Sequence, residues 1–266
     1  MGCGCMYLII ALPLAASKNK RGSNYDEWQR GVPSEVWYWH EWISTKGQRW
    51  HDEQTYNFRM NRTSPFQFED LLVAMRRRSY QTHFNVLDVG AGPVTFVGYQ
   101  LRQLHYCRLN IIALDPLAEY YDEIWEKNDR APPVRTQLMP AEALRNRFRD
   151  NTFDLVLSRN ALDHAVNPMH SVLQMVKVCK HGGRVILQQS LNEGLSQKYG
   201  GMHQWNFDYR NGSFMIWNVV DQINASAILQ RMPANVVCNA EVYGQTQHHN
   251  FGWLRCDIEK RRKRLM

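Results

Sequence analysis

The sequence predicts a doubly wound α/β fold: a mostly parallel sheet with an antiparallel edge hairpin, preceded by a helical N-terminal cap. Three observations carry this prediction. From Asn85 onward, short apolar runs alternate with amphipathic stretches, as in a parallel sheet covered by helices on both faces. A glycine-containing turn follows the first of these runs, and an aromatic-rich segment precedes it. The length of 266 residues is enough for one large domain with such a cap.

Composition and charge narrow the class of protein. Hydrophobic residues make up 44% of the chain and charged residues 21%, values that exclude a disordered chain. The net charge of +7 is concentrated in 76–78 and in 259–266. Nucleic-acid enzymes more often spread basic residues along a groove with interleaved aromatics. We therefore expect no polynucleotide partner and interpret 259–266 as a solvated basic tail.

The N-terminal residues 1–22 are interpreted as a leader of unknown purpose. They have an apolar centre but lack the positive leading region of a signal peptide. No apolar run in the chain approaches the roughly 20 residues that cross a bilayer. The six cysteines contain no CxxC pair, which favours a reducing compartment. We expect a cytoplasmic protein, and the leader leaves a membrane-associated or targeted form open.

Residues 23–83 are predicted to form the aromatic-rich helical cap. In 34–43, Val36, Trp39 and Ile43 fall on one helical face. Ser64 followed by Pro65 is the usual start of a helix, with Ser as the N-cap and Pro in the first turn.

The sheet domain is predicted to occupy 84–258. Its strands are expected at 86–89, 109–114, 153–157 and 184–187, and its helices near 96–104, 118–126, 141–148 and 169–179. Gly182 and Gly183 predict a left-handed turn at the end of the last helix. Further strands are expected at 214–217, 235–242 and 252–258. Because no helix separates the last two, they predict an antiparallel edge hairpin. An insertion near 192–212 is predicted to be a substrate lid.

The sharpest motif is the turn after the first strand. Asp88 is followed by Gly90 and Gly92, so the backbone can approach a ligand closely. A dinucleotide site would require a third glycine at position 95, where Thr95 stands instead. A carboxylate at position 88 can hold a cationic amino-acid moiety through its ammonium group or through a bound water. The alternative is that the glycines only permit tight packing of strand against helix.

Three further motifs follow in order. Asp115 and Pro116 end the second strand, where an acid can accept both hydroxyls of a ribose. The alternative is that Asp115 caps the next helix. An Ala-Glu pair follows the third strand, and residues 160–164 end the fourth.

This ordered series resembles the class I S-adenosylmethionine-dependent methyltransferases over roughly 84–190. The resemblance implies a Rossmann-like domain with S-adenosylmethionine as cofactor. It implies that the glycine loop holds the methionine portion, the strand-2 acid the ribose, the Ala-Glu pair the adenine, and the backbone after strand 4 the methionine side. The cofactor-binding residues implied are Asp88, Gly90, Ala91, Gly92, Asp115, Pro116, Ala141, Glu142 and Asn160.

Methyl transfer requires an aligned acceptor and often a base. We predict His164 and His203 as catalytic, with His164 the best-placed base because an imidazole suits proton transfer near neutrality. Asp163, Trp205 and Asn206 are predicted to contact the substrate. The alternative is that Asp163 and His164 only satisfy loop hydrogen bonds. No metal is predicted, and magnesium held by Asp163, Asn192 and Glu193 ranks second.

The function expected is therefore methyl transfer to a hydroxyl or amine of a small polar acceptor, a glycan or a metabolite. Two alternatives remain: a methyltransferase acting on RNA or protein, and a non-enzymatic scaffold that binds the cofactor. The sequence leaves the oligomeric state open.

Overall fold

The computed structural model describes residues 24–232, 236–243 and 252–261. The leader predicted at 1–22 and the last five residues of the basic tail lie outside the described residues.

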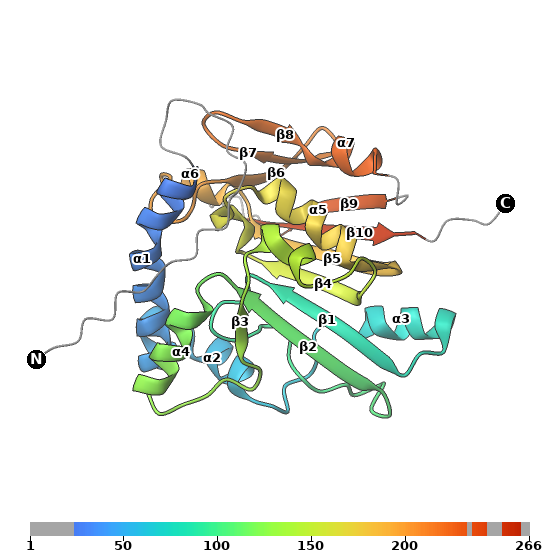
Figure 1. Ribbon diagram of the computed structural model, residues 1–266, viewed down its shortest axis with the longest axis horizontal. Coiled ribbons are helices and arrows are strands. Elements are labelled where there is room, and N and C mark those ends of the chain that lie inside the picture. The colour runs from blue at the N-terminus through green and yellow to red at the C-terminus, as the bar shows by residue number, and fades with distance from the viewer. Residues whose placement is uncertain (1–23, 233–235, 244–251, 262–266) are drawn as a thin grey trace, which may run out of the picture.

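Among the described residues, the central feature is a seven-stranded sheet in the order β3-β2-β1-β4-β5-β10-β9 (Figure 1). The first five strands of that order run parallel, and β10 pairs antiparallel with both β5 and β9. The predicted doubly wound sheet with an antiparallel edge hairpin is thus confirmed. Its strands are β1 (His83–Val89), β2 (Arg108–Asp115), β3 (Thr136–Leu138), β4 (Phe153–Arg159), β5 (Cys179–Ser190), β9 (Val236–Tyr243) and β10 (Trp253–Lys260).

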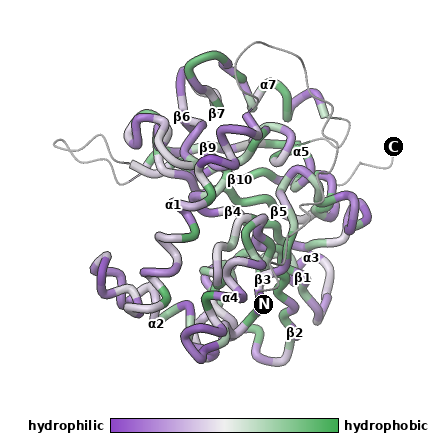
Figure 2. Tube along the Cα trace, turned by 60° about the vertical axis from the view of Figure 1, so that its left-hand side comes forward, coloured by the Kyte–Doolittle hydropathy of each residue, from purple (hydrophilic) through white to green (hydrophobic). Residues whose placement is uncertain are grey.

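Alternate residues of the central strands face two different cores, as the two-residue period of a strand requires. In β1, Leu87 and Val89 join one core, whereas Phe84 and Val86 join the other. The first core includes α5 (Pro168–Val178), and the second lies against α3 (Glu69–Ser79). Figure 2 shows the hydrophobic residues concentrated in these central strands. The sheet is therefore buried on both faces and holds the carboxyl ends of its strands in fixed positions.

A second, smaller sheet was not predicted. It consists of β6 (Asn206–Arg210), β7 (Ser213–Trp217) and β8 (Gln222–Asn224), followed by α7 (Ala225–Gln230). The strand expected at 214–217 is present, but it belongs to this sheet. The predicted insertion contains α6 (Glu193–Ser196), turns, and β6.

The cap contains α1 (Asn24–Ser44), the 3-10 turn η1 (Gln48–Trp50), α2 (Glu53–Met60) and α3. The predicted apolar face of α1 is present: Ile43 is buried, and Val36 and Trp39 are partly buried beside it. This face packs with α4 (Ala118–Lys127), next to which α1 lies in Figure 1. None of the described helices is both long enough and apolar enough to cross a membrane.

The helix predicted at 96–104 is wrong, and so is the helix start at Ser64–Pro65. Instead, the two segments bind each other: Ser64 O accepts the N–H groups of Tyr99 and Gln100, and Gln100 O accepts the N–H of Phe66. Gly98 has φ +76°, and a Cβ there would lie 2.0 Å from Pro65 O. Because these backbone groups are satisfied between the segments, neither segment forms its own helix, and α3 begins only at Glu69.

Two further elements differ from the prediction. Residues 141–148 contain the 3-10 helix η2 (Ala141–Asn146) rather than an α-helix. Gly182 does have positive φ (87°), but it lies within β5, where the pairing with β4 shifts register between Phe153 and Leu155.

The basic tail is not solvated throughout. β10 extends to Lys260, whose side chain is buried and donates hydrogen bonds to the carbonyls of Val176 (3.0 Å), Lys177 (3.0 Å) and Cys179 (2.7 Å). These carbonyls lie at or just after the C-terminus of α5, where a cation is favoured by the helix dipole. The predicted boundary at 258/259 is corrected accordingly.

Replacing Lys260 with Met should destabilise the fold by about 2 kcal/mol, because three carbonyls lose a charged donor. The free energy of unfolding in urea measures this loss. The control is a chain that ends at Arg261, which should unfold like the full chain. Equal stability of the Lys260→Met variant and the full chain would contradict a stabilising role for this lysine.

Candidate active site

The glycine loop after β1 has the backbone conformation that only glycine adopts readily. Gly90 has φ 70° and Gly92 has φ 65°, both in the left-handed region. A Cβ at Gly90 would lie 2.4 Å from the Cβ of Ala161, just after β4. The N–H groups of Gly90 and Ala91 both donate to Leu114 O, at the end of β2. The loop therefore joins the carboxyl ends of β1, β2 and β4.

Asp115 ties this loop to the end of β2. Its Oδ2 accepts the N–H of Gly92 (3.0 Å), and its Oδ1 accepts the N–H of Leu117 (2.9 Å) just before α4. Burial raises the pKa of Asp115 to about 6, despite these backbone donors. Asp115 thus makes the local contact that the capping alternative expected, and it also fixes the glycine loop.

Asp88 lies fully buried below the loop. Its Oδ2 accepts a hydrogen bond from the Thr95 hydroxyl (2.6 Å), so the residue that replaces the third glycine has a structural role. Its Oδ1 has no hydrogen-bond partner among the described residues. Burial raises the pKa of Asp88 to about 6. A buried carboxylate with an unused oxygen favours a donor or a cation beside it.

Helix α1 covers the glycine loop through Trp39. A Cβ at Gly92 would lie 3.0 Å from Cζ2 of Trp39, so the indole packs directly against this glycine. The Trp39 indole N–H donates to Oε1 of Glu35 (2.7 Å), which fixes the ring. Sequence reasoning identified Trp39 only as a core residue of the cap, because nothing in the local pattern indicates which loop it meets.

The remaining predicted cofactor residues lie on neighbouring strand ends. Pro116 is half-buried after β2, and Ala141 begins η2. Glu142 Oε1 accepts the N–H of Asn167 (3.0 Å), the N-cap of α5. Asn160 has φ 46°, and its Oδ1 accepts the N–H of Ser190 (3.0 Å) at the end of β5.

Three of the predicted site residues meet in one cluster. His203 Nδ1 lies 2.7 Å from Oδ2 of Asp163 and 3.0 Å from Nε2 of His164. Asp163 and His164 come from η3 (Leu162–His164), directly after β4, whereas His203 comes from the turns after α6. The carbonyl of Asp163 accepts the N–H groups of Gln204 and Trp205, which holds the two segments together.

In this cluster, the carboxylate of Asp163 and the imidazolium of His203 stabilise each other. Burial disfavours the imidazolium of His203, but its hydrogen bond with Asp163 and the charge of that carboxylate outweigh burial and raise the pKa of His203. Burial also disfavours the carboxylate of Asp163, but His164 and His203 outweigh it and lower the pKa of Asp163. With the proton placed on Nδ1 of His203, Asp163 accepts it and Nε2 carries the free lone pair. This arrangement can remove a proton from a nearby hydroxyl or amine.

The same three side chains also have the composition of a metal site. Their ligand atoms lie within 4.8 Å of one another, close enough for one divalent ion to reach all three. This set differs from the magnesium set considered in the sequence: Glu193 Oε1 instead accepts a hydrogen bond from Gln197 (3.0 Å) within the α6 segment.

The other two predicted substrate residues are buried. Trp205 is 3% exposed, and its indole N–H has no partner among the described residues. Asn206 is 0% exposed, and its Nδ2 donates to the Tyr199 hydroxyl and to Trp217 O. Its Oδ1 accepts the N–H of Leu195 (2.7 Å). The Asn206 amide therefore ties the insertion to the small sheet.

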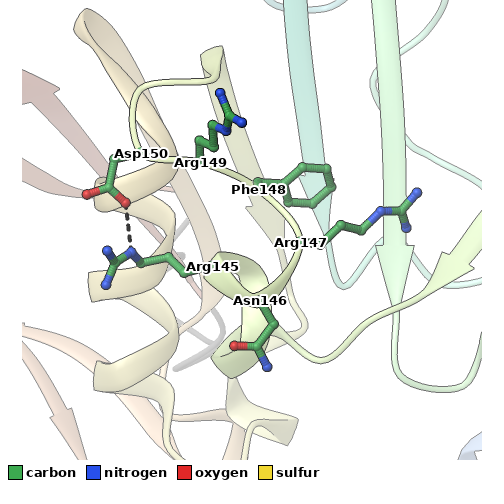
Figure 3. A pocket seen from close by; sticks show the side chains of 6 residues that line it. All are labelled: Arg145, Asn146, Arg147, Phe148, Arg149 and Asp150. Atoms are coloured by element: carbon green, nitrogen blue, oxygen red, sulfur yellow. Dashed lines mark hydrogen bonds and ion pairs between the residues drawn. The ribbon is translucent and has the colours of Figure 1, made fainter.

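A surface cavity of about 390 Å³ is formed by a single loop, 145–150, and contains none of the predicted site residues (Figure 3). Another cavity, of about 300 Å³, lies where α2 meets the carboxyl end of β4. Its lining residues are Gln54, Thr55, Phe58, Arg59, Gln67, Phe96 and Arg159. Sequence reasoning missed this cavity, although Arg159 directly precedes Asn160 in the strand-4 motif.

A known protein family matches part of the sheet domain. Residues 87–187 match the family model described as a methyltransferase domain. No curated protein matches the chain. Similar solved structures include an S-adenosylmethionine-dependent methyltransferase from Methanosarcina mazei, with 13% identity over 70% of this chain and 97% of that one at a TM-score of 0.40.

Two other solved structures are similar over comparable lengths of this chain but cover different shares of their own. The YcgJ protein of Bacillus subtilis is 14% identical over 72% of this chain and 98% of that one, with a TM-score of 0.37. The 16S rRNA N2 G1207 methyltransferase of T. thermophilus, solved with AdoMet and guanosine, is 12% identical over 73% and 38%, with a TM-score of 0.35. The family match shows that residues 87–187 form a methyltransferase domain, and these residues include the glycine loop and the central parallel strands of this sheet.

Proposed function

We propose that this methyltransferase acts on a hydroxyl or amine of a small polar acceptor, a glycan or a metabolite. The observation that carries the proposal is the hydrogen-bonded pair of Asp163 and His203 near the glycine loop. Ala161, which contacts Gly90, directly precedes the turn that carries Asp163. On the other side, a Cβ at Gly31 of α1 would lie 2.6 Å from the carbonyl carbon of Gly201, close to His203.

The residues around the loop fit S-adenosylmethionine, the cofactor of the family. When bound, it supplies an electrophilic methyl group on a sulfonium. The unused Oδ1 of the buried Asp88 suits the cationic methionine portion, and the carboxylate of Asp115 suits the ribose hydroxyls. Gly90 and Gly92 allow the close backbone approach that a bulkier residue would block. Glu142 is the weaker match, since one of its oxygens already accepts the N–H of Asn167.

His203 is the proposed base. Its Nε2 would take the proton of the acceptor hydroxyl or amine, whose oxygen or nitrogen would receive the methyl group as the methyl–sulfur bond breaks and the sulfur leaves as a neutral thioether. Asp163 holds the ring through Nδ1–H and stabilises the imidazolium that forms. His164 contacts the same Nδ1, and we propose that it fixes the position of His203. This ordering differs from the sequence prediction, which ranked His164 first, because the carboxylate contacts His203 at the shorter distance.

Limited access favours a small acceptor. The side chains of His164 and His203 are only 15% and 24% exposed. A macromolecular substrate would bind the basic clusters of the chain. In the C-terminal cluster, Lys260 is not accessible to a substrate, because it is buried against the end of α5. The RNA or protein alternative would therefore depend mainly on residues 76–78, in the last turn of α3.

Calorimetry with S-adenosylmethionine, followed by a methyl-transfer screen over sugars, amines and RNA, tests the proposal. Turnover of a sugar or amine is the expected result. Turnover of RNA alone would establish the macromolecular alternative. Cofactor binding with no transfer to any acceptor would favour the non-enzymatic scaffold.

Replacing Asp115 with Ala should weaken S-adenosylmethionine binding roughly ten- to a hundredfold, because two hydrogen bonds to the ribose are lost. The glycine loop also loses its contact at the N–H of Gly92. Calorimetric titration measures the change, with Asp122→Ala as the matched control, because Asp122 forms an ion pair with Arg135 on the exposed side of α4. Unchanged affinity in the Asp115→Ala variant would remove this residue from the cofactor site.

A further inference from the structure

The cavity between α2 and the end of β4 contains two guanidinium groups. Arg59 comes from α2 and Arg159 is the last residue of β4. Phe58 and Phe96 supply apolar walls, and the exposed side chains of Gln54 and Gln67 lie at its rim. The cavity thus combines positive charge, aromatic surface and amide groups, as ligand sites commonly do.

Arg59 is held in place by contacts with uncharged groups, and the carboxylates of Asp88 and Asp52 act on its charge without forming an ion pair with it. One of its terminal nitrogens, Nη1, donates to the carbonyl of Val94 (3.3 Å), and its guanidinium lies 5.7 Å from the ring centre of Trp42. Its Nε is buried and has no hydrogen-bond partner within 24–232, 236–243 and 252–261. No carboxylate of the described residues forms an ion pair with it. A buried N–H donor of a cation without an acceptor is costly unless a ligand supplies one.

Arg159 is likewise positioned by aromatic rings rather than by an acid. Its guanidinium lies 5.4 Å from the ring centre of Phe96 and 5.3 Å from that of Trp253, with no ion pair among the described residues. Burial and the positive charge of Arg159 lower the pKa of Arg59, and together they outweigh the opposite effect of the Asp88 and Asp52 carboxylates. Two like charges that line one cavity repel each other, and a bound anion removes that repulsion.

We propose that this cavity binds an oxyanion group of the methyl acceptor, a carboxylate or a phosphate, between Arg59 and Arg159. The identity of the ligand as the acceptor rests on the proposed function, whereas the anion site itself does not. Guanidinium groups recognise both oxyanions through paired N–H donors. Arg159 is followed directly by Asn160, Ala161 and the turn of Asp163, so an acceptor anchored here reaches along the end of β4 toward the proposed base.

The first experiment measures binding of two probes, inorganic phosphate and benzoate, by calorimetry. We expect at least one to bind, and the Arg159→Gln variant to bind it about tenfold more weakly. Arg159→Lys should fall between the two, since it keeps the charge but loses the paired donors. The matched control is Arg149→Gln, because Arg149 lies in the exposed loop of the other cavity (Figure 3). Preference for one probe separates a phosphate from a carboxylate acceptor.

Two results would overturn the site. One is that neither probe binds the full-length chain. The other is that Arg149→Gln weakens binding as much as Arg159→Gln does, which would indicate nonspecific attraction to basic surface. Arg159→Gln and Arg159→Lys keep the test independent of Arg59, whose contacts with Val94 and Trp42 also support the fold.

The second experiment separates the acceptor from the cofactor, since the methionine end of S-adenosylmethionine also carries a carboxylate. Probe binding is measured again with saturating S-adenosylhomocysteine. Retained probe binding supports an acceptor site, and competitive displacement shows that the arginines hold the cofactor and overturns the proposal. If the probe binds but neither S-adenosylmethionine nor S-adenosylhomocysteine does, the proposed function fails while the anion site stands.

Discussion

Replacing His203 with Ala should lower kcat by about a hundredfold or more, while the affinity for S-adenosylmethionine stays within about twofold. The imidazole supplies the proposed base, and Asp163 provides its orientation at 2.7 Å. Asp163→Asn should lose a comparable factor, because an amide does not stabilise the imidazolium. His164→Ala should cost about tenfold, since His164 contacts His203 without replacing its carboxylate partner.

A chelator added to the unmodified protein in the methyl-transfer assay provides the decisive control for this cluster. Full activity in chelator, together with the loss in His203→Ala, supports the proton-transfer role. Loss of activity in chelator that returns with a divalent ion would instead assign Asp163, His164 and His203 to a metal, and the general-base mechanism would be wrong.

The pH dependence of kcat should also reflect the titration of His203. A general base must be neutral to accept a proton, so kcat should rise with pH and level off above the pKa of His203. Because the pKa of His203 is raised, the midpoint should lie above the ordinary value of about 6.5. In Asp163→Asn the residual activity should have a lower midpoint, since the carboxylate that raises this pKa is gone. A profile that is flat from about pH 5 to 9 would exclude His203 as the titrating base.

Replacing Glu69 with Ala should destabilise the fold by about 3 kcal/mol or more. The buried carboxylate accepts three backbone N–H groups, those of Arg102 (2.9 Å), Gln103 (2.7 Å) and Leu104 (2.7 Å). Alanine would leave all three donors without an acceptor, and each such loss costs about 1 kcal/mol or more. Urea unfolding monitored by circular dichroism measures the difference.

The neighbouring Asp70 offers a matched control. Its carboxylate accepts one side-chain hydrogen bond from Gln103 (3.1 Å) at an exposed position, so Asp70→Ala should change stability by less than about 0.5 kcal/mol. Glu69→Gln, which keeps one acceptor oxygen, should fall between the two. If Glu69→Ala and Asp70→Ala were equally mild, the three hydrogen bonds of Glu69 would contribute little to stability.

The parallel sheet could be predicted from the sequence because the signal for each strand lies within a few neighbouring residues. Each buried strand is a short apolar run, and Leu87 and Val86 face opposite cores simply because they are adjacent in one strand. The left-handed glycines and the acid at the end of β2 are likewise local signals. They predicted the strand ends around which the site is built.

The features that sequence reasoning missed depend on distant partners. Residues 96–104 have the sequence pattern of a helix, but Ser64 and Glu69 accept backbone N–H groups of this segment. Lys260 has the position of a tail residue in the sequence, but its side chain donates to carbonyls at the end of α5. The sequence named His164 and His203 separately. Their meeting over Asp163 depends on the path of the insertion, which no local periodicity encodes. The cavity of Arg59 and Arg159 was missed for the same reason.

The pairing of 64–69 with 97–104 bears on the order in which the chain assembles. Segment 64–69 leaves the ribosome before its partner, so the acceptors are already present when the glycine loop and the residues after it are synthesised. Residues 97–104 have little local structure to fall back on, because their backbone donors are satisfied across a gap of about thirty positions. A fragment starting at β1 would therefore lack the segment that pairs with 97–104, so we expect the cap and the sheet to fold as one unit.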